Sequence, residues 1–219
     1  MVKVERSYPA LESLAEEAKK VSGKYDKTDV IKRLKEDFYE KCYICEMDNL
    51  QDPQVEHLLP HENGRYPERK FDWDNLFWSC GHCNSVKNQS KYASGILNCC
   101  IDDPEQEMIF LLSDNKVSAA AKNVENYEAV LAATLVEEVF GLHNTGMREY
   151  KSDMRLQELN REMNVLYDNL EALKKHPGSK VCLRKLKALL RKESRFAAFK
   201  RNYIRENCAE FEQLMPYIC

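Results

Sequence analysis

Two cysteine pairs with the spacing Cys-x-x-Cys are the residues of this sequence best suited to chemistry. The pairs are Cys42 with Cys45 and Cys80 with Cys83. Each pair lets two sulfur atoms approach one ion from a tight turn, and four thiolates fill the tetrahedral coordination of Zn²⁺. No position is then left for water, so we expect a structural zinc site that adds folding energy. A redox-active pair, and a site in which His82 replaces one cysteine, are the alternatives.

Residues with hydrolytic potential lie between these pairs and directly after them. Glu56 and His57 are neighbours, Asn75 follows, and Asn84 comes directly after the last cysteine of the second pair. Hydrolysis of a phosphodiester needs a base, a hard cation and a group that holds the base in position. His57 suits the base, and the oxygens of Glu56 and Asn84 suit Mg²⁺ or Mn²⁺. Asn75 is placed to hydrogen-bond backbone near the base and so to orient it.

Three further residues are candidate phosphate contacts: His61, Lys87 and Lys91. Lys87 lies one helical turn after the candidate metal ligand at position 84. A solvated loop histidine is the competing interpretation of His61. Neighbours on a regular strand point to opposite faces, so Glu56 and His57 need a bend near Pro60 to converge.

The elements that must position these residues follow from hydrophobic patterning. In the centre, the pattern predicts strands at 54–59 and 73–78 and a short helix at 84–92, which is a ββα unit. Flanking segments read as helices and one hairpin; they are the helices 9–21, 28–40, 124–140, 146–175 and 179–207, and the hairpin 108–119. We therefore expect an α+β fold in which a zinc-bearing ββα core is embedded in a mostly helical chain.

The same pattern suggests three regions. They are an N-terminal helical brace at 1–41, the core at 42–95, and a hairpin with a C-terminal helical region at 96–219. The chain of 219 residues is 43% hydrophobic and 32% charged, as in ordinary soluble proteins. No apolar run approaches the ~20 residues that span a bilayer, and the first residues lack a signal-peptide core. We expect a cytoplasmic protein without a membrane segment.

Cysteine count and charge distribution add two expectations. Nine cysteines, an odd number, argue against a complete disulfide framework, and five are expected as core or surface thiols: Cys99, Cys100, Cys182, Cys208 and Cys219. The net charge is −3, yet residues 174–205 hold twelve Lys or Arg and one acid. This asymmetry indicates a nucleic acid or an acidic partner, and a solvated helix face is the alternative. We expect one basic helix here, with its charges outside its apolar face, and expect Glu46 and Glu62 to be exposed.

The motif residues together resemble the HNH endonuclease family. The similarity runs through Cys42-x-x-Cys45, Glu56-His57-Leu-Leu-Pro60, Asn75-Leu76 and Cys80-x-x-Cys83-Asn84-x-x-Lys87, and it covers about a quarter of the chain. The family pattern is Asp-His-x-x-Pro, Asn-Leu and Cys-x-x-Cys followed by His or Asn. The resemblance implies a ββα-metal fold that cleaves DNA.

Carried over residue by residue, the resemblance makes His57 the general base and Asn75 the residue that orients it. It makes Glu56 and Asn84 the ligands of the catalytic ion. Glu56 stands where the family has Asp, which lengthens the ligand arm by one methylene. Asn84 stands where His is commoner, which favours Mg²⁺ or Mn²⁺ over softer metals.

A looser similarity points to one branch of that family. Glu46 after the first cysteine pair, and the stretch 138–144 followed by Arg148 and Arg155, resemble the Septu- and retron-associated proteins of the PtuB type, which act in bacterial defence against phage. That branch works with an ATPase, so the resemblance implies a separate, PtuA-like ATPase subunit as a partner. Two alternatives remain open: a non-catalytic zinc module that binds nucleic acid or a protein, and a stand-alone restriction-type HNH nuclease.

Overall fold

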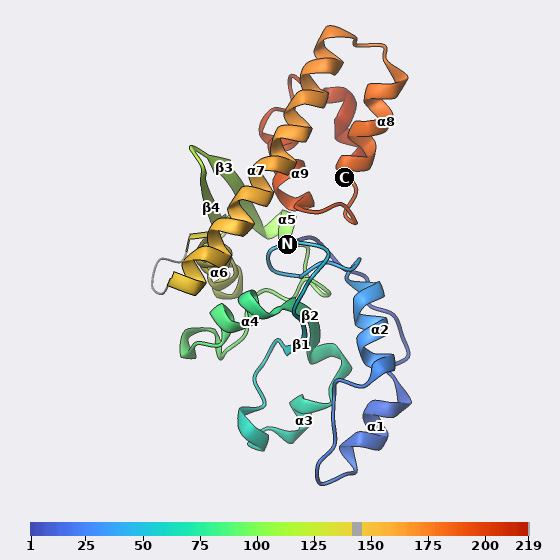
Figure 1. The fold of residues 1–219 in the computed structure, drawn as a ribbon, viewed down its shortest axis with the longest axis vertical. Helices are drawn as coiled ribbons and strands as arrows, with labels where there is room; N and C mark the ends of the chain where they lie inside the picture. Colours follow the sequence, from blue (N-terminus) through green and yellow to red (C-terminus); the bar gives the residue numbers. More distant parts are fainter. Residues whose placement is uncertain (142–145, 219) are drawn as a thin grey trace.

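The structure is a computed structural model, and it describes residues 1–141 and 146–218. The chain combines helices, which make up about 52% of it, with two small antiparallel sheets (Figure 1). The expected mixture of helix and strand is therefore confirmed. Part of the stretch 138–144, including His143, and the terminal Cys219 lie outside the described residues.

A two-stranded sheet and one helix form the centre of the chain. Strand β1 (Pro53–His57) pairs antiparallel with β2 (Leu76–Cys80), so that Glu56 lies opposite Phe77. Helix α4 (Gly81–Lys87) begins directly after β2 and packs against both strands. All of β2 is buried, as its apolar sequence suggests. The ββα order expected for this segment is present.

The boundaries of these central elements differ from the predicted ones. Residues Trp73–Asn75, expected at the start of a strand, form a 3-10 turn that is capped by the Asp72 side chain, which accepts from the Asp74 amide at 3.1 Å. The helix begins at Gly81 rather than at residue 84, and it ends at Lys87. Gly81 lies against Asp52, because a Cβ at Gly81 would stand 1.9 Å from the Asp52 carboxylate. The Asp72 cap thus accounts for the later start of β2, and the close approach of Gly81 to Asp52 accounts for the start of α4.

The N-terminal helices are shorter than the periodicity suggests. They are α1 (Glu12–Ala18) and α2 (Thr28–Asp37). Val30 and Leu34 of α2 are buried, and the helix packs against β2. Tyr39 and Glu40 follow with positive φ angles, which turn the chain into the first cysteine pair.

A hairpin and two helices lie on the other side of the central unit (Figure 1). Strands β3 (Met108–Ser113) and β4 (Lys116–Ala121) follow the short helix α5 (Pro104–Glu107). Two residues with positive φ, Asp114 and Asn115, join the strands, as a tight hairpin turn requires. Helices α6 (Tyr127–Gly141) and α7 (Gly146–Lys175) come next, and α6 packs against both β4 and α4.

The prediction of a single last helix at 179–207 is wrong. The chain instead forms α8 (Lys180–Leu189) and α9 (Ala197–Glu206), followed by a 3-10 segment, Glu212–Tyr217. The connection turns around Lys41, whose Nζ donates to the carbonyls of Lys192 and Ser194 at 2.5 and 2.8 Å. A buried cation from a distant segment therefore draws these carbonyls out of helical geometry.

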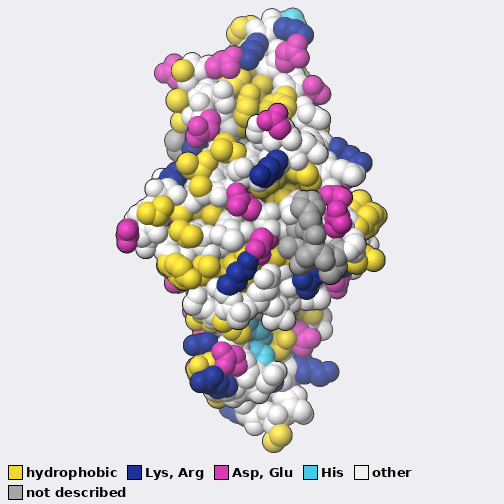
Figure 2. Space-filling model, turned by 90° about the vertical axis from the view of Figure 1, so that its left-hand side faces the viewer, with side chains coloured by type: hydrophobic (Ala, Val, Ile, Leu, Met, Phe, Trp, Pro, Cys, Tyr) yellow, Lys and Arg dark blue, Asp and Glu magenta, His cyan; other side chains and the backbone are white. Residues whose placement is uncertain are grey.

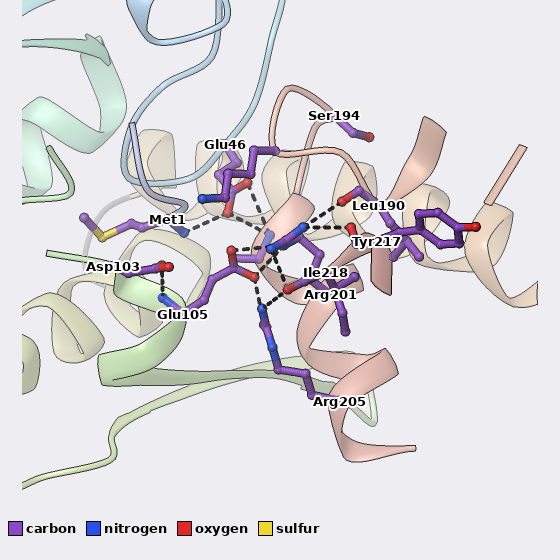
Figure 3. Close-up of polar contacts among 12 residues, drawn as sticks. Met1, Glu46, Asp103, Glu105, Leu190, Ser194, Arg201, Arg205, Tyr217 and Ile218 are labelled. Atoms are coloured by element: carbon purple, nitrogen blue, oxygen red, sulfur yellow. Dashed lines mark hydrogen bonds and ion pairs between the residues drawn. The ribbon is translucent and has the colours of Figure 1, made fainter. Parts of the chain in front are cut away.

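The prediction that Glu46 is exposed is also wrong, because only 1% of its surface is accessible. Its carboxylate accepts from the Met1 ammonium at 2.7 Å (Figure 3). It pairs with Lys41 at 3.4 Å. It also accepts from the Ala198 amide at 3.3 Å, in the first turn of α9. Glu46 therefore caps α9 from a separate part of the chain.

Several basic residues expected on the outside of the last helix are buried. Lys200 and Arg201 of α9 are 0% and 4% exposed. Lys200 pairs with Glu162 at 2.8 Å, and Arg201 pairs with Glu105 at 2.7 Å (Figure 3 for the second pair). A buried cation needs such a partner, since desolvation of an unpaired charge is costly. The acidic partners come from α5 and α7, which the sequence pattern could not place.

Buried apolar residues from all three predicted regions pack into one continuous core. The region boundaries at 41 and 95 therefore stay a sequence-based prediction. Within the two described stretches, no helix has the length and apolar character needed to cross a membrane.

Candidate functional site

The four cysteines of the two pairs converge at one end of the central sheet. All four are buried, and their sulfur atoms lie within 4.8 Å of one another. The sulfurs of Cys45 and Cys80 are 4.0 Å apart. A tetrahedral zinc thiolate site with Zn–S distances of about 2.3 Å places its sulfurs roughly 3.8 Å apart. The cluster could thus hold a structural metal ion such as zinc.

A guanidinium from a distant helix contacts this cluster. Arg155 of α7 donates from Nη2 to Cys80 Sγ at 3.0 Å. Contacts from the other three sulfurs, together with Arg155, lower the pKa of the Cys80 thiol below its ordinary value. The buried Arg155 guanidinium therefore offsets negative charge on the cysteine sulfurs.

His82 lies within the second cysteine pair but faces away from the sulfurs. Its Nε2 contacts the Val139 carbonyl of α6 at 3.0 Å and Ser152 Oγ of α7 at 3.3 Å. Burial, with the nearby Arg155, lowers the pKa of His82 to about 4. His82 is therefore neutral at pH 7 and joins the cysteine cluster to two helices.

An open cavity of about 630 Å³ lies beside the sheet. Five residues singled out from the sequence line it together: Glu56, His57, His61, Asn84 and Lys87. Tyr25, from the loop between α1 and α2, also lines it. Figure 2 shows histidine side chains at the surface in the lower half of the face that it draws. Neighbouring residues of β1 thus both reach this cavity, although the strand pairing is regular through His57.

His57 is held at one ring nitrogen. Its Nε2 lies 3.1 Å from the Lys70 carbonyl, which can only accept, so Nε2 carries the proton in the neutral ring. Nδ1 is then the basic nitrogen. Tyr25 packs edge-on against the ring, with centroids 4.5 Å apart. Burial lowers the pKa of His57 to about 4, so the ring is neutral and able to accept a proton at pH 7.

Asn75 fixes the backbone around that histidine. Its Oδ1 accepts from the Leu59 amide at 2.8 Å, and its Nδ2 donates to the carbonyls of Leu59 and Arg69 at 2.9 Å each. Asn75 is 5% exposed. Arg69 precedes Lys70, whose carbonyl binds His57, so Asn75 holds both the segment that follows the histidine and the segment that orients its ring.

Glu56 is buried and already engaged. Its Oε1 pairs with Lys87 Nζ at 2.6 Å, and its Oε2 accepts from the Tyr43 hydroxyl. Lys87 also donates to the carbonyls of His57 and Leu58 at 3.1 and 2.9 Å. Lys87 thus lines the cavity with its ammonium held by Glu56 and by two backbone carbonyls.

Asn84 lies at the cavity wall in the second turn of the α4 segment. Its Nδ2 donates to Gln54 Oε1 at 2.5 Å, which leaves Oδ1 as its ligand atom. A carboxylate and an amide oxygen lining one cavity are hard ligands of the kind that Mg²⁺ and Mn²⁺ prefer. Glu56 and Asn84 line the same cavity, and the Glu56 carboxylate is held there by Lys87 and Tyr43.

The two remaining candidate phosphate contacts, His61 and Lys91, lie in different surroundings. His61 lines the cavity, its ring centroid lies 4.8 Å from that of His57, and its buried Nδ1 has no hydrogen-bond partner. Lys91 forms an ion pair with Glu138 of α6. The structure thus brings His61 to the candidate site and ties Lys91 to a neighbouring helix.

Sequence reasoning missed four residues of this site: Tyr25, Tyr43, Gln54 and Arg155 as a contact of the cysteines. Tyr25 and Arg155 come from distant segments and carry no local signal. Gln54 is two residues before Glu56 on β1, and residues two apart share a face of a strand. That periodicity could have pointed to Gln54.

Comparison with known proteins gives no assignment to a family. No protein-family model matches the chain, and no curated protein matches it. Any statement of function therefore depends on the geometry of the cysteine cluster and the cavity.

Proposed function

We propose that the protein is a metal-dependent phosphodiester hydrolase of the HNH type, with DNA as its substrate. The observation that carries the proposal is that His57, Glu56 and Asn84 line one cavity, with Asn84 directly following Cys83 of the cysteine cluster. A base, a carboxylate and an amide oxygen in one open cavity are the groups that this reaction needs. The cluster is assigned a scaffolding role, since four cysteines leave no open position on a zinc ion.

In the proposed reaction, water loses its proton to His57 Nδ1 as it attacks the phosphorus in line. The ester P–O bond opposite the attack breaks, and the leaving oxygen takes a proton from solvent. The Nε2 hydrogen bond to the Lys70 carbonyl holds the ring and stabilises the imidazolium that forms. Glu56 and Asn84 would hold one Mg²⁺ or Mn²⁺ ion, which supplies charge stabilisation for the phosphate and the leaving oxygen. His61 is assigned to the phosphate, because its buried Nδ1 faces no protein partner.

The engagement of Glu56 by Lys87 and Tyr43 favours one other candidate. In a non-catalytic zinc module, Glu56 would serve only as the partner of a buried ammonium. That alternative leaves the neutral, oriented His57 and the cavity without a role. Metal-dependent cleavage distinguishes the two.

The test is nicking of a supercoiled plasmid by zinc-loaded protein in Mg²⁺, in Mn²⁺ and in EDTA. We expect nicking with either ion and none in EDTA. Asn84→Ala should raise the Mg²⁺ concentration for half-maximal nicking at least tenfold. Asn88→Ala is the matched control, because Asn88 lines the same cavity one turn further on and is exposed. Its half-maximal concentration should stay within twofold. Absence of nicking with both ions, or nicking in EDTA, would contradict the proposal.

A role in anti-phage defence with an ATPase partner is the more specific part of the proposal. It is supported by the sequence resemblance alone. Co-purification with the product of a neighbouring ATPase gene is its test. Full nicking activity without any associated ATPase would favour the stand-alone nuclease.

A further inference from the structure

Helix α8 carries a basic outer face. Its inner side packs through Leu186 and the following Leu190, both 0% exposed. Lys180, Arg184 and Lys187 occupy positions i, i+4 and i+7, and all three are exposed. Residues at this spacing lie one above the other on a helix surface, with Cβ atoms about 5–6 Å apart. The result is a single stripe of cations.

Among the residues that the structure describes, no acidic side chain pairs with these cations. Elsewhere between residues 174 and 205, six basic side chains form ion pairs, namely Lys174, Lys175, Arg195, Lys200, Arg201 and Arg205. Among the described residues, Arg191 and Lys192, which follow α8 directly, form none. In the described part of the chain, no ion pair involves Lys180, Arg184 or Lys187. Residues 180–192 also contain no Asp or Glu. The unpaired charge of the region is therefore concentrated on α8.

The composition of this face identifies the kind of partner. Its outward apolar residues are only Val181 and Ala188. Protein interfaces bury aromatic and apolar anchors and are depleted in Lys, whereas phosphate groups are bound by Lys and Arg. The one aromatic ring that the described residues bring into contact with the stripe is that of Tyr217, whose centroid lies 4.1 Å from Lys187 Nζ in a cation–π contact. A chain of phosphates suits this face better than a folded acidic protein.

We propose that α8 is an anchoring surface for the phosphodiester backbone of a nucleic acid. The surface is separate from the cavity: Figure 1 shows α8 near one end of the molecule and the β1–β2 unit in its other half. The assignment of the polyanion as nucleic acid rests on the proposed function, whereas the surface itself rests on unpaired charge. α8 would hold substrate at a distance from the bond that is cut.

The experiment measures binding without cleavage. Fluorescence polarisation in EDTA follows labelled 30-bp duplexes of DNA and of RNA with the full-length protein, at several salt concentrations. The variant changes Lys180, Arg184 and Lys187 to Gln. We expect its affinity for DNA at 150 mM salt to fall at least tenfold, and the slope of log K against log salt to fall by about 2–3, since each phosphate contact contributes about 0.9.

A matched control removes the same charge elsewhere. Lys19, Lys32 and Lys116 are exposed and lie outside α8, and their change to Gln should alter affinity by less than twofold. Equal affinity and salt slope for the α8 variant and the control would overturn the proposal. A labelled polyglutamate peptide tests the protein alternative. If the α8 variant loses polyglutamate binding but keeps DNA and RNA binding, the surface serves an acidic protein and the proposal is wrong.

Plasmid nicking, measured separately, keeps the two proposals distinguishable. Loss of DNA binding in the α8 variant of a protein that shows no nicking would support the anchoring surface and reject the nuclease. Equal loss with DNA and RNA duplexes would show that α8 reads the backbone common to both.

Discussion

Arg155 Nη2 lies 3.0 Å from Cys80 Sγ, which joins the long helix α7 to the second cysteine pair. Thiolates that hold a divalent ion in a Cys₄ site leave a net charge of about −2. A buried guanidinium beside one of them offsets part of that charge and gives the sulfur a donor. The C-terminal helices are therefore coupled to the stability of the metal cluster.

This contact predicts that Arg155→Met weakens zinc binding. Loss of an outer contact to a metal ligand typically lowers metal affinity by 10- to 100-fold. The measurement is competition for zinc with a coloured chelator. Arg148→Met is the control, since Arg148 lies on the same helix and donates to Ser85 Oγ. If the two variants release zinc at the same chelator concentration, Arg155 has no role in holding the cluster.

Cys80→Ser should remove the metal and unfold the central unit. A structural zinc site contributes on the order of 10 kcal/mol to folding, more than a small ββα unit obtains from its core. Zinc content by atomic absorption should be about one ion per chain in the wild type and far less in the variant. Cys208→Ser, at an exposed cysteine, should match the wild type. A folded Cys80→Ser protein without zinc would speak against a structural site.

Asn75→Ala should destabilise the protein strongly. It leaves the Leu59 amide and the carbonyls of Leu59 and Arg69 without their partner, at about 1–3 kcal/mol for each group that stays buried. We expect a loss of about 3 kcal/mol in urea unfolding. Asn169→Ala, which removes a hydrogen bond on the surface of α7, should cost less than about 1 kcal/mol. A change no larger than that of the control would show that Asn75 does not hold the loop.

The stability that Glu46 contributes should depend on pH. Burial alone would raise its pKa, but the Met1 ammonium and Lys41 outweigh burial and lower the pKa to about 2. In the unfolded chain the pKa is about 4.3, so folding favours the ionised form. The contribution is present above about pH 5, at about 3 kcal/mol, and is lost as the pH falls toward 2.

Urea unfolding of wild type and Glu46→Gln at pH 6 and pH 3 measures this dependence. Zinc loss in acid affects both proteins, so their difference isolates the carboxylate. The difference in unfolding free energy should shrink by at least half between pH 6 and pH 3. A difference that stays constant would mean that Glu46 gains nothing from its ionised form.

Local patterns predicted the parts of this protein that depend on short segments. The Cys-x-x-Cys spacing indicated a four-sulfur cluster, and the four sulfurs do converge. Alternating and helical periodicity predicted the β1–β2–α4 order and the hairpin. Even the reach of Asn75 to backbone near His57 could be anticipated from its place on the neighbouring strand.

The features that could not be predicted from the sequence depend on contacts between distant segments. Lys41 breaks the last helix by binding the carbonyls of Lys192 and Ser194, and no Gly or Pro marks that break. Glu46 is buried because an ammonium and a helix N-terminus meet it there. The buried pairing of Glu56 with Lys87 has the same origin. A charged residue is predicted to be exposed from the sequence alone, because the sequence does not show the partner with which it is buried.

The most direct test of the central claim is plasmid nicking in Mg²⁺ by His57→Ala and His57→Asn. His176→Ala serves as the control, because His176 is exposed after the end of α7. Zinc content and circular dichroism establish that each variant is folded. We predict that both His57 variants lose nicking by about a hundredfold or more, in line with removal of a general base, while the control keeps it. Nicking within tenfold of wild type by a folded, zinc-loaded His57→Ala protein would contradict the account.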